Sequence, residues 1–229
     1  MPHVRHTGDL WVFGYGSLMW RPDFPFVERS AATVAGYHRA FCIASTMHRG
    51  TRQRPGLVLG LDRGRACAGI AYRVAAKDVA PVLDYLRARE LIYGVYRETM
   101  LHATFPPGAS VGEAPALSYT AERSHPAYIG DMPLACEAAV IRGARGQSGT
   151  NLDYLINTVR HLRELGIRER RMERLMGLAA GHAANGREAA EPHRSAARGL
   201  VRFWCRRPAP APVLPVGDQR RFGYRIAVA

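Results

Sequence analysis

Leu10-Trp11-Val12-Phe13-Gly14-Tyr15-Gly16-Ser17-Leu18-Met19-Trp20 is the stretch in which an apolar run, typical of a buried strand, breaks into Gly-Tyr-Gly-Ser. Two glycines permit backbone conformations that a side chain forbids, so consecutive N–H groups can converge on an anionic or carbonyl oxygen. The hydroxyl of Ser17 adds one more polar group. The stretch predicts a strand and a loop that grips a small substrate largely through main chain. The alternative is a tight turn between two strands.

A second stretch, DVAPVLDYLRARE from Asp78 to Glu90, has the periodicity of an amphipathic helix. Its apolar residues recur at helical spacing, at Val79, Val82, Leu83 and Leu86. At roughly 100° per residue, Glu90 extends this apolar stripe, whereas Arg87 and Arg89 are expected to point elsewhere. Burial disfavours a charged carboxylate, so we expect the pKa of Glu90 to rise, which suits a general base near neutral pH. The alternative is a helix-end glutamate that turns outward or pairs with an arginine.

The composition indicates one globular domain of ordinary size, because the 229 residues are 47% hydrophobic. No apolar stretch approaches the roughly 20 residues of a membrane span, and the N-terminus lacks the layout of a signal peptide. The four cysteines form no CxxC pair, and the nine histidines form no metal-binding helical pair. The sequence therefore predicts a cytoplasmic protein with neither a disulfide scaffold nor a bound metal.

The net charge of +13 is compatible with nucleic-acid binding, but its distribution argues against a specific interface. Nearly all the positive charge is arginine, with Lys77 as the only lysine, and no compact basic run is interleaved with aromatics. The cluster from Arg168 to Arg174 is interrupted by Glu169 and Glu173, which is typical of a solvated helix face. We therefore predict no specific nucleic-acid partner. An acidic small substrate or weak nonspecific RNA adhesion remains compatible with the charge.

The remaining elements follow from local pattern. Strands are expected at 32–45 with a bend at Gly36, at 56–61 and 67–74 as a hairpin around an Asp-Arg-Gly-Arg turn, at 95–104 and at 116–120. Helices are expected at 134–144, at 168–178 and from Asn151 to before Gly166, with Leu152, Leu155, Ile156, Val159 and Leu162 on one face that lies against the sheet. From about Ala179 the composition shifts to Ala, Gly, Arg and Pro. This predicts a folded domain over 1–178 and an irregular tail over 179–229.

Three further polar residues are candidates for the site, with plainer alternatives. His48 and Arg49 lie in a polar turn, where structural surface roles are favoured over binding of an anionic substrate. Glu98 is a rival acidic residue, but on an alternating strand it is expected to be a cross-strand partner of an arginine.

With these pieces in place, the chain resembles the ChaC-type γ-glutamylcyclotransferases, the family that splits glutathione into 5-oxoproline and cysteinylglycine. The resemblance is carried by VFGYGSLMWRPDF (12–24), STMHRG with PG (45–56), CAGIAYRV (67–74), YLRARE (85–90), HPAYIG (125–130) and SGTNLDYL (148–155). These motifs stand in the family's order over much of the first 165 residues or so. The tail is not covered.

The resemblance implies an α+β fold, a mixed or antiparallel β-barrel flanked by helices. It also implies that Glu90 is the catalytic glutamate and that one loop forms the floor holding the γ-glutamyl group, namely Val12, Phe13, Gly14, Tyr15, Gly16, Ser17 and Leu18. Tyr154, although off the main apolar face, is a further candidate for lining the pocket. The segment Leu91 to Gly94 departs from the glycine-rich turn of some members, which affects the shape of the donor pocket.

The implied reaction needs no cofactor, because the substrate's own α-amine attacks its γ-carbonyl. The small-molecule partner is then glutathione, with Glu90 accepting and returning the proton. Ser17 is not expected to be a nucleophile, because Tyr15 and Met19 occupy the glycine positions of a GxSxG motif. Two alternatives stay open: a cyclotransferase for another γ-glutamyl amine, and a noncatalytic basic module that binds γ-glutamyl compounds or RNA.

Overall fold

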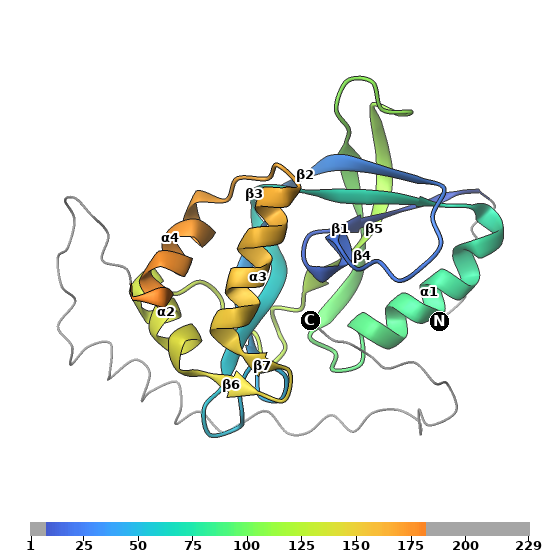
Figure 1. The fold of residues 1–229 in the computed structure, drawn as a ribbon. Helices are drawn as coiled ribbons and strands as arrows, with labels where there is room; N and C mark the ends of the chain where they lie inside the picture. The colour runs from blue at the N-terminus through green and yellow to red at the C-terminus, as the bar shows by residue number, and fades with distance from the viewer. Residues whose placement is uncertain (1–7, 182–229) are drawn as a thin grey trace. The chain divides into compact units, whose positions relative to one another are not determined.

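The computed structural model describes residues 8–181 of the chain (Figure 1). Their contacts divide the chain into two compact units, which are described separately below. The first holds residues 8–40 and 60–125, and the second holds residues 41–59 and 126–181. The predicted tail lies outside the described residues from residue 182 onward.

Five strands form a closed barrel in the order β1-β3-β2-β4-β5. Their bounds are β1 Leu10–Gly14, β2 Glu28–Ser45, β3 Gly56–Val74, β4 Tyr96–Thr104 and β5 Glu113–Ala121. β1 pairs antiparallel with β3 and parallel with β5, so the sheet is mixed. The five residues of β1 are all buried, as expected for an apolar run with neighbours on both edges. The predicted α+β class with a mixed barrel is confirmed.

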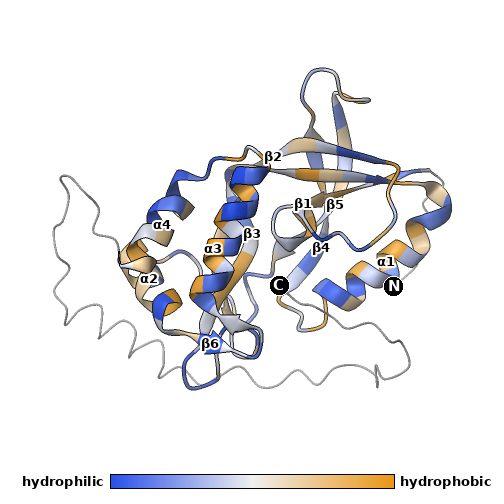
Figure 2. Ribbon diagram, in the orientation of Figure 1, coloured by the Kyte–Doolittle hydropathy of each residue, from blue (hydrophilic) through white to orange (hydrophobic). Residues whose placement is uncertain are grey.

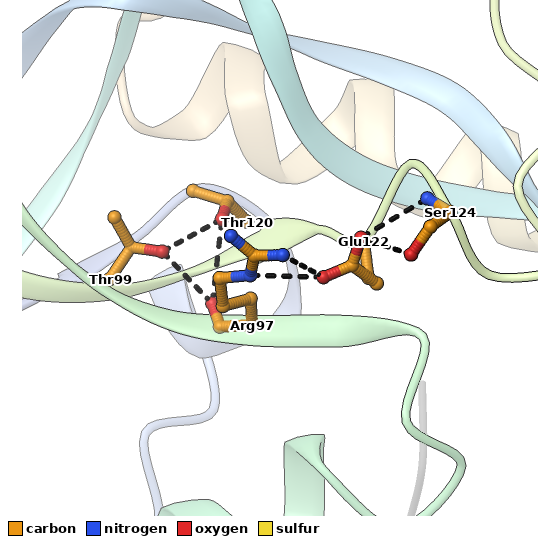
Figure 3. A network of polar contacts seen from close by, with 5 residues as sticks. All are labelled: Arg97, Thr99, Thr120, Glu122 and Ser124. Atoms are coloured by element: carbon orange, nitrogen blue, oxygen red, sulfur yellow. Dashed lines mark hydrogen bonds and ion pairs between the residues drawn. The ribbon is translucent and has the colours of Figure 1, made fainter.

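The β4–β5 pair ends in a polar network that ties the two strands together (Figure 3). The hydroxyl groups of Thr99 and Thr120 lie 2.8 Å apart across the strands. Arg97 donates from Nε to Glu122 Oε2 at 2.9 Å, and Ser124 donates its N–H and hydroxyl to Glu122 Oε1 at 3.1 and 2.7 Å. Glu122 thereby anchors the turn that leaves β5.

Helix α1 spans Val79–Glu90 (Figure 1), and its burial pattern is the predicted amphipathic one. All four residues of the predicted apolar stripe are buried, namely Val79, Val82, Leu83 and Leu86. Asp78 precedes the helix, but its side chain makes no capping hydrogen bond. Burial of the stripe therefore orients the helix and, with it, the direction of Glu90.

The predicted hairpin at 56–61 and 67–74 is wrong, because β3 is one strand from Gly56 to Val74. The Asp-Arg-Gly-Arg sequence resembles a turn, but two of its residues, Asp62 and Gly64, make tertiary contacts from within the strand. Asp62 is buried and accepts a hydrogen bond from Arg123 Nε at 2.7 Å. A Cβ on Gly64 would lie 2.2 Å from His38 Nδ1, so this glycine makes room for a side chain of β2. The bend predicted in β2 is confirmed by the φ of +79° at Gly36.

The second unit contains α2 Leu134–Gly143, α3 Asn151–Glu164 and α4 Arg170–Ala180, with a small sheet of β6 Arg145–Gly146 and β7 Gly149–Thr150. Hydrophobic and hydrophilic residues alternate along α3 (Figure 2). Leu155, Val159 and Leu162 are buried as predicted, but Ile156 is 39% exposed and Tyr154 is buried. The apolar face of α3 is thus rotated towards Tyr154 relative to the prediction.

In the part of the chain that the structure describes, no helix has the length and apolar character that crossing a membrane requires.

Candidate active site

The loop after β1 is built on two fully buried residues, Val12 and Phe13, each 0% exposed. Both pair with β3, opposite Tyr72 and Ala71, so they anchor the loop through the sheet. Gly14 then turns the chain against a short 3-10 helix, Ser17–Met19. A Cβ on Gly14 would stand 2.9 Å from the Leu18 Cβ, which explains the need for glycine at this position.

Three buried side chains hold the carbonyl groups of this loop. Ser118 Oγ donates to the carbonyl of Phe13 at 2.9 Å, and Tyr72 donates to that of Met19 at 2.7 Å. Arg39, 5% exposed, donates from Nε to the carbonyl of Tyr15 and from Nη2 to that of Ala68 at 2.7 Å. Because these contacts fix the peptide planes, the loop geometry is set before any ligand binds.

The N–H groups of Ser17 and Leu18 begin the 3-10 helix, where N–H groups have no acceptor within the helix. Such groups can receive an anionic or carbonyl oxygen. Tyr15 and Leu18 themselves are buried, at 8% and 6% exposure, while Gly16 and Ser17 are partly exposed. The loop therefore presents main chain and one hydroxyl, rather than large side chains.

Glu90 is the last residue of α1, and its side chain is only 17% exposed. Burial raises the pKa of the carboxyl group above its ordinary value, while the neighbouring Arg89 opposes that rise. Arg89 Nε lies 3.1 Å from Glu90 Oε1. The arrangement matches the sheltered carboxyl group that the apolar stripe predicts. A carboxylate of raised pKa is a stronger proton acceptor than an exposed one.

The prediction that Arg89 points away from the apolar stripe extended by Glu90 is wrong, and the alternative that Glu90 pairs with an arginine is confirmed. The guanidinium of Arg89, on a side chain 9% exposed, contacts Glu90 and also donates from Nη2 to Ser17 Oγ at 2.9 Å. A long flexible side chain reaches well beyond the face that its Cα occupies, so helical periodicity does not locate its head group. Glu90 and the loop after β1 therefore share one cation.

Glu98 does pair with an arginine, as predicted, although the partner lies on α1 rather than across the sheet. Arg87 donates to both carboxyl oxygens of Glu98, at 2.9 and 2.8 Å. Tyr119 donates to Glu98 Oε2 at 3.4 Å. Burial, followed by the negative charges of Glu98 and Glu90, raises the pKa of Tyr119, so this phenol stays protonated beside Glu90.

His48, Arg49 and Tyr154 belong to the second unit, where the structure brings them together. His48 Nδ1 lies 3.1 Å from Ser148 Oγ, and Arg49 donates to the carbonyl of Ser148. The Arg49 guanidinium carbon lies 5.0 Å from the centroid of the Tyr154 ring. These contacts are consistent with the structural roles expected for His48 and Arg49. The candidacy of Tyr154 for the pocket stays a prediction.

Sequence reasoning missed two arginines of this site, Arg39 and Arg89. Arg39 contacts the carbonyl group of Tyr15, which is distant in sequence. Arg89 lies within the YLRARE motif next to Glu90, but its contact with Ser17 is likewise distant in sequence. Within residues 8–181, no group of three or more His, Cys, Asp and Glu side chains is placed to hold a metal ion.

Comparison with known proteins gives a family match and several relatives. The family model for ChaC-like proteins matches residues 10–180. The Escherichia coli glutathione-specific γ-glutamylcyclotransferase is 37% identical over 162 residues, covering 71% of this chain and 69% of that protein. The human glutathione-specific γ-glutamylcyclotransferase 1 is 40% identical over 157 residues, covering 66% and 70%. The Arabidopsis thaliana γ-glutamylcyclotransferase 2-3 is 35% identical over 166 residues, covering 70% and 83%.

Among solved structures, a yeast γ-glutamyl cyclotransferase specific to glutathione shares the fold with a TM-score of 0.67 at 21% identity. The match covers 80% of this chain and 100% of that one. The family model spans well over half of the 229 residues, including the loop after β1 and Glu90. The chain therefore belongs to the ChaC-like protein family.

Proposed function

We propose that this protein is a glutathione-specific γ-glutamylcyclotransferase that converts glutathione into 5-oxoproline and cysteinylglycine. The α-amine nitrogen of the γ-glutamyl group attacks its own γ-carbonyl carbon, forming the C–N bond of a five-membered lactam. The bond between that carbon and the cysteinyl nitrogen breaks. The attacking nitrogen gives up two protons as its ammonium group becomes the lactam N–H, and the departing nitrogen takes up two as it leaves as an ammonium group; Glu90 carries one of them, and the second is exchanged with solvent. Atoms and electrons balance without an external nucleophile or cofactor.

Glu90 is assigned the proton transfers of this reaction. Its carboxylate removes a proton from the α-ammonium group, which frees the nitrogen lone pair, and then returns the proton to the departing cysteinyl nitrogen. Burial raises the pKa of Glu90, which makes its carboxylate a stronger proton acceptor for these transfers.

The loop after β1 is assigned the binding of the γ-glutamyl group, through Val12, Phe13, Gly14, Tyr15, Gly16, Ser17 and Leu18. The side chains of Val12 and Phe13 are committed to the core, so their part is to hold the floor rigid. Loop N–H groups hold the substrate and stabilise the oxyanion that develops on its carbonyl. Folding the substrate into reacting distance contributes much of the acceleration, because an amine near its own carbonyl has a high effective molarity.

One observation supports this assignment above the others: a sheltered carboxyl group and the Gly-Tyr-Gly-Ser loop are joined through a single guanidinium. Arg89 lies 3.1 Å from Glu90 Oε1 and 2.9 Å from Ser17 Oγ. A proton acceptor and a main-chain binding loop thereby adjoin within one unit. The names of the E. coli and human relatives support glutathione as the substrate.

The direct test is to incubate the purified full chain with glutathione and to follow 5-oxoproline and cysteinylglycine by mass spectrometry. We expect both products in equal amounts, with no added metal or cofactor. Release of free glutamate in place of 5-oxoproline would indicate hydrolysis and would contradict the proposal.

A panel of γ-glutamyl amines distinguishes a glutathione-specific enzyme from a cyclotransferase that acts on another γ-glutamyl amine. The Arabidopsis relative is named for the γ-glutamylcyclotransferase reaction without glutathione, which motivates this second candidate. Equal turnover of γ-glutamylalanine and glutathione would favour the broader enzyme. Salt-sensitive retention of RNA without any lactam would favour the noncatalytic basic module that the net charge of +13 suggests.

The proposal places the reaction in the cytoplasm. The four cysteines of the sequence are scattered and form no CxxC pair, which suits a reducing compartment.

A further inference from the structure

We propose that Arg89 is a positioning residue. It holds the Glu90 carboxyl group at a fixed position relative to the loop after β1, and therefore relative to the γ-glutamyl group bound there. This inference rests on the proposed function for its catalytic meaning. The contact network itself belongs to the fold and can be measured without substrate.

The guanidinium of Arg89 joins three segments of the first unit. Nε faces Glu90 Oε1 on the same helix at 3.1 Å. Nη2 donates to Ser17 Oγ in the loop at 2.9 Å. Nη1 donates to the carbonyl of Arg21 at 2.9 Å and to the hydroxyl of Tyr85 at 2.8 Å. One planar group therefore sets the distance between the end of α1 and the loop.

The acceptors bound by the N–H groups of Arg89 distinguish a positioning role from the binding of a substrate anion. A guanidinium carries five N–H groups in a fixed fork. Four of them are used by the contacts of Arg89 with Glu90, Ser17, Arg21 and Tyr85. In addition, Asp23 Oδ2 lies 3.6 Å from Nη1. Bidentate binding of a substrate carboxylate uses two parallel N–H donors, and the contacts of Arg89 leave no such pair. Arg89 therefore links protein groups to one another.

Shape and burial make this arginine hard to replace. Its side chain is 9% exposed, so its donors are directed at protein groups rather than at water. A lysine ammonium keeps the charge but is a single point on a flexible stem, and it cannot span the four acceptors at once. Charge and geometry can therefore be separated by comparing lysine with an uncharged side chain of similar length.

The titration midpoint of Glu90 depends on the charged and titratable groups around it. Arg89, from the same helix, opposes the rise in the pKa of Glu90 that burial causes. Tyr119, from β5, interacts electrostatically with Glu90 and donates to Glu98 of β4, which Arg87 neutralises. From the loop, Asp23 approaches Arg89 rather than Glu90. Arg89 is thus the cation whose removal changes the Glu90 carboxyl group most directly.

The experiment compares Arg89→Met, Arg89→Lys and the wild-type full chain, with Arg73→Met as a matched control. Arg73 is a β3 arginine that also bridges two acids, Asp9 and Glu28, neither of them in the site. Two readouts are taken: the pH profile of kcat for 5-oxoproline release, and the titration of the Glu90 carboxyl carbon by ¹³C NMR, assigned with Glu90→Gln.

We expect Arg89→Met to move the Glu90 titration and the acid limb of kcat upward by about one pH unit or more, because a carboxylate loses its cation. Arg89→Lys should leave both midpoints near those of the wild type and lower kcat by about tenfold, because the charge is kept and the geometry is lost. Arg73→Met should match the wild type in both readouts.

An unshifted Glu90 titration in Arg89→Met would overturn the proposal, as would a wild-type kcat in both Arg89 variants. If Arg89→Met does not fold, Arg89→Lys decides between the outcomes. Full activity of Arg89→Lys contradicts the positioning role, and a reduced kcat with an unmoved Glu90 titration midpoint supports it. Absence of 5-oxoproline from the wild type would refute the proposed function. In that case the NMR titration still tests the Arg89–Glu90 contact.

Discussion

Glu90 experiences two opposing influences on its charge. Removal of its carboxyl group from water favours the protonated form, and the adjacent Arg89 favours the carboxylate, with burial the larger of the two. The pKa of this carboxyl group is therefore raised above its ordinary value, and a carboxylate of raised pKa is a stronger proton acceptor.

The pH dependence of the reaction follows from this balance. The reaction needs Glu90 ionised, and its pKa in the folded protein is raised, so kcat should increase with pH through a limb that lies above the ordinary glutamate value of 4.5. The measurement is the pH profile of 5-oxoproline release under saturating glutathione. A profile that is flat down to pH 4.5 would show that another group limits the reaction.

Strand β3 supports the site through one close approach to the end of β1. A Cβ on Gly69 would lie 2.3 Å from the carbonyl oxygen of Gly14 and 2.6 Å from the ring of Phe13. Both neighbours belong to the strand that carries the loop, so neither can move without displacing it. Gly69 therefore fixes the depth at which the loop sits on the barrel.

Replacing Gly69 by alanine should displace the loop and reduce kcat/KM on the order of 100-fold, since small misplacements in an active site are costly. Gly112→Ala is the control, because no atom lies within 4 Å of a Cβ at that position. Circular dichroism and kinetics would be measured on both variants. Equal kinetics for Gly69→Ala and Gly112→Ala would contradict the role given to this contact.

Elements differ in how far the sequence alone predicts them. Helix α1 and the sheltered position of Glu90 were predictable, because helical periodicity is local and its apolar stripe is complete. The hairpin around Asp62 to Arg65 was mispredicted, because two tertiary contacts override a turn-like sequence: the buried carboxylate of Asp62 pairs with the half-exposed Arg123, and Gly64 packs against His38. The contacts of Arg39 with Tyr15 and of Arg89 with Ser17 were missed because they are tertiary contacts, which no spacing in the sequence reveals.

At the scale of the whole molecule, each unit has a carboxyl group outside the site whose pKa is shifted by folding. In the first unit, hydrogen bonds from Ser124 and Arg97 lower the pKa of Glu122 to about 2 (Figure 3). In the second, burial raises the pKa of Glu137, whose Oε2 lies 2.7 Å from Arg171 Nη1. The two groups should therefore affect the pH dependence of stability with opposite sign.

Glu122 has a folded-state pKa below its unfolded value, so its stabilisation is present above pH 4.5 and is lost as the pH falls towards about 2. Glu122→Gln should lower the melting temperature at pH 7 and have little effect near pH 2. Thermal unfolding of both proteins across this range checks the prediction. An equal difference at both pH values would contradict it.

Glu137 has a folded-state pKa above its unfolded value, so the wild type loses stability as the pH rises above about 4.5, the ordinary glutamate value. Relative to the wild type, Glu137→Gln should become more stable as the pH increases from 4 to 8. Urea unfolding at several pH values measures this trend. A difference that shrinks with rising pH would show that the Arg171 contact outweighs burial.

If Glu90 transfers the protons of an intramolecular cyclisation, the Glu90→Gln variant should be folded and nearly inactive. The amide is close in size to the carboxyl group but cannot accept the proton. With 5-oxoproline release measured by mass spectrometry and folding checked by circular dichroism, we expect activity lower than that of the wild type by a factor on the order of 100 or more. A folded Glu90→Gln protein with wild-type release of 5-oxoproline would contradict this role of Glu90.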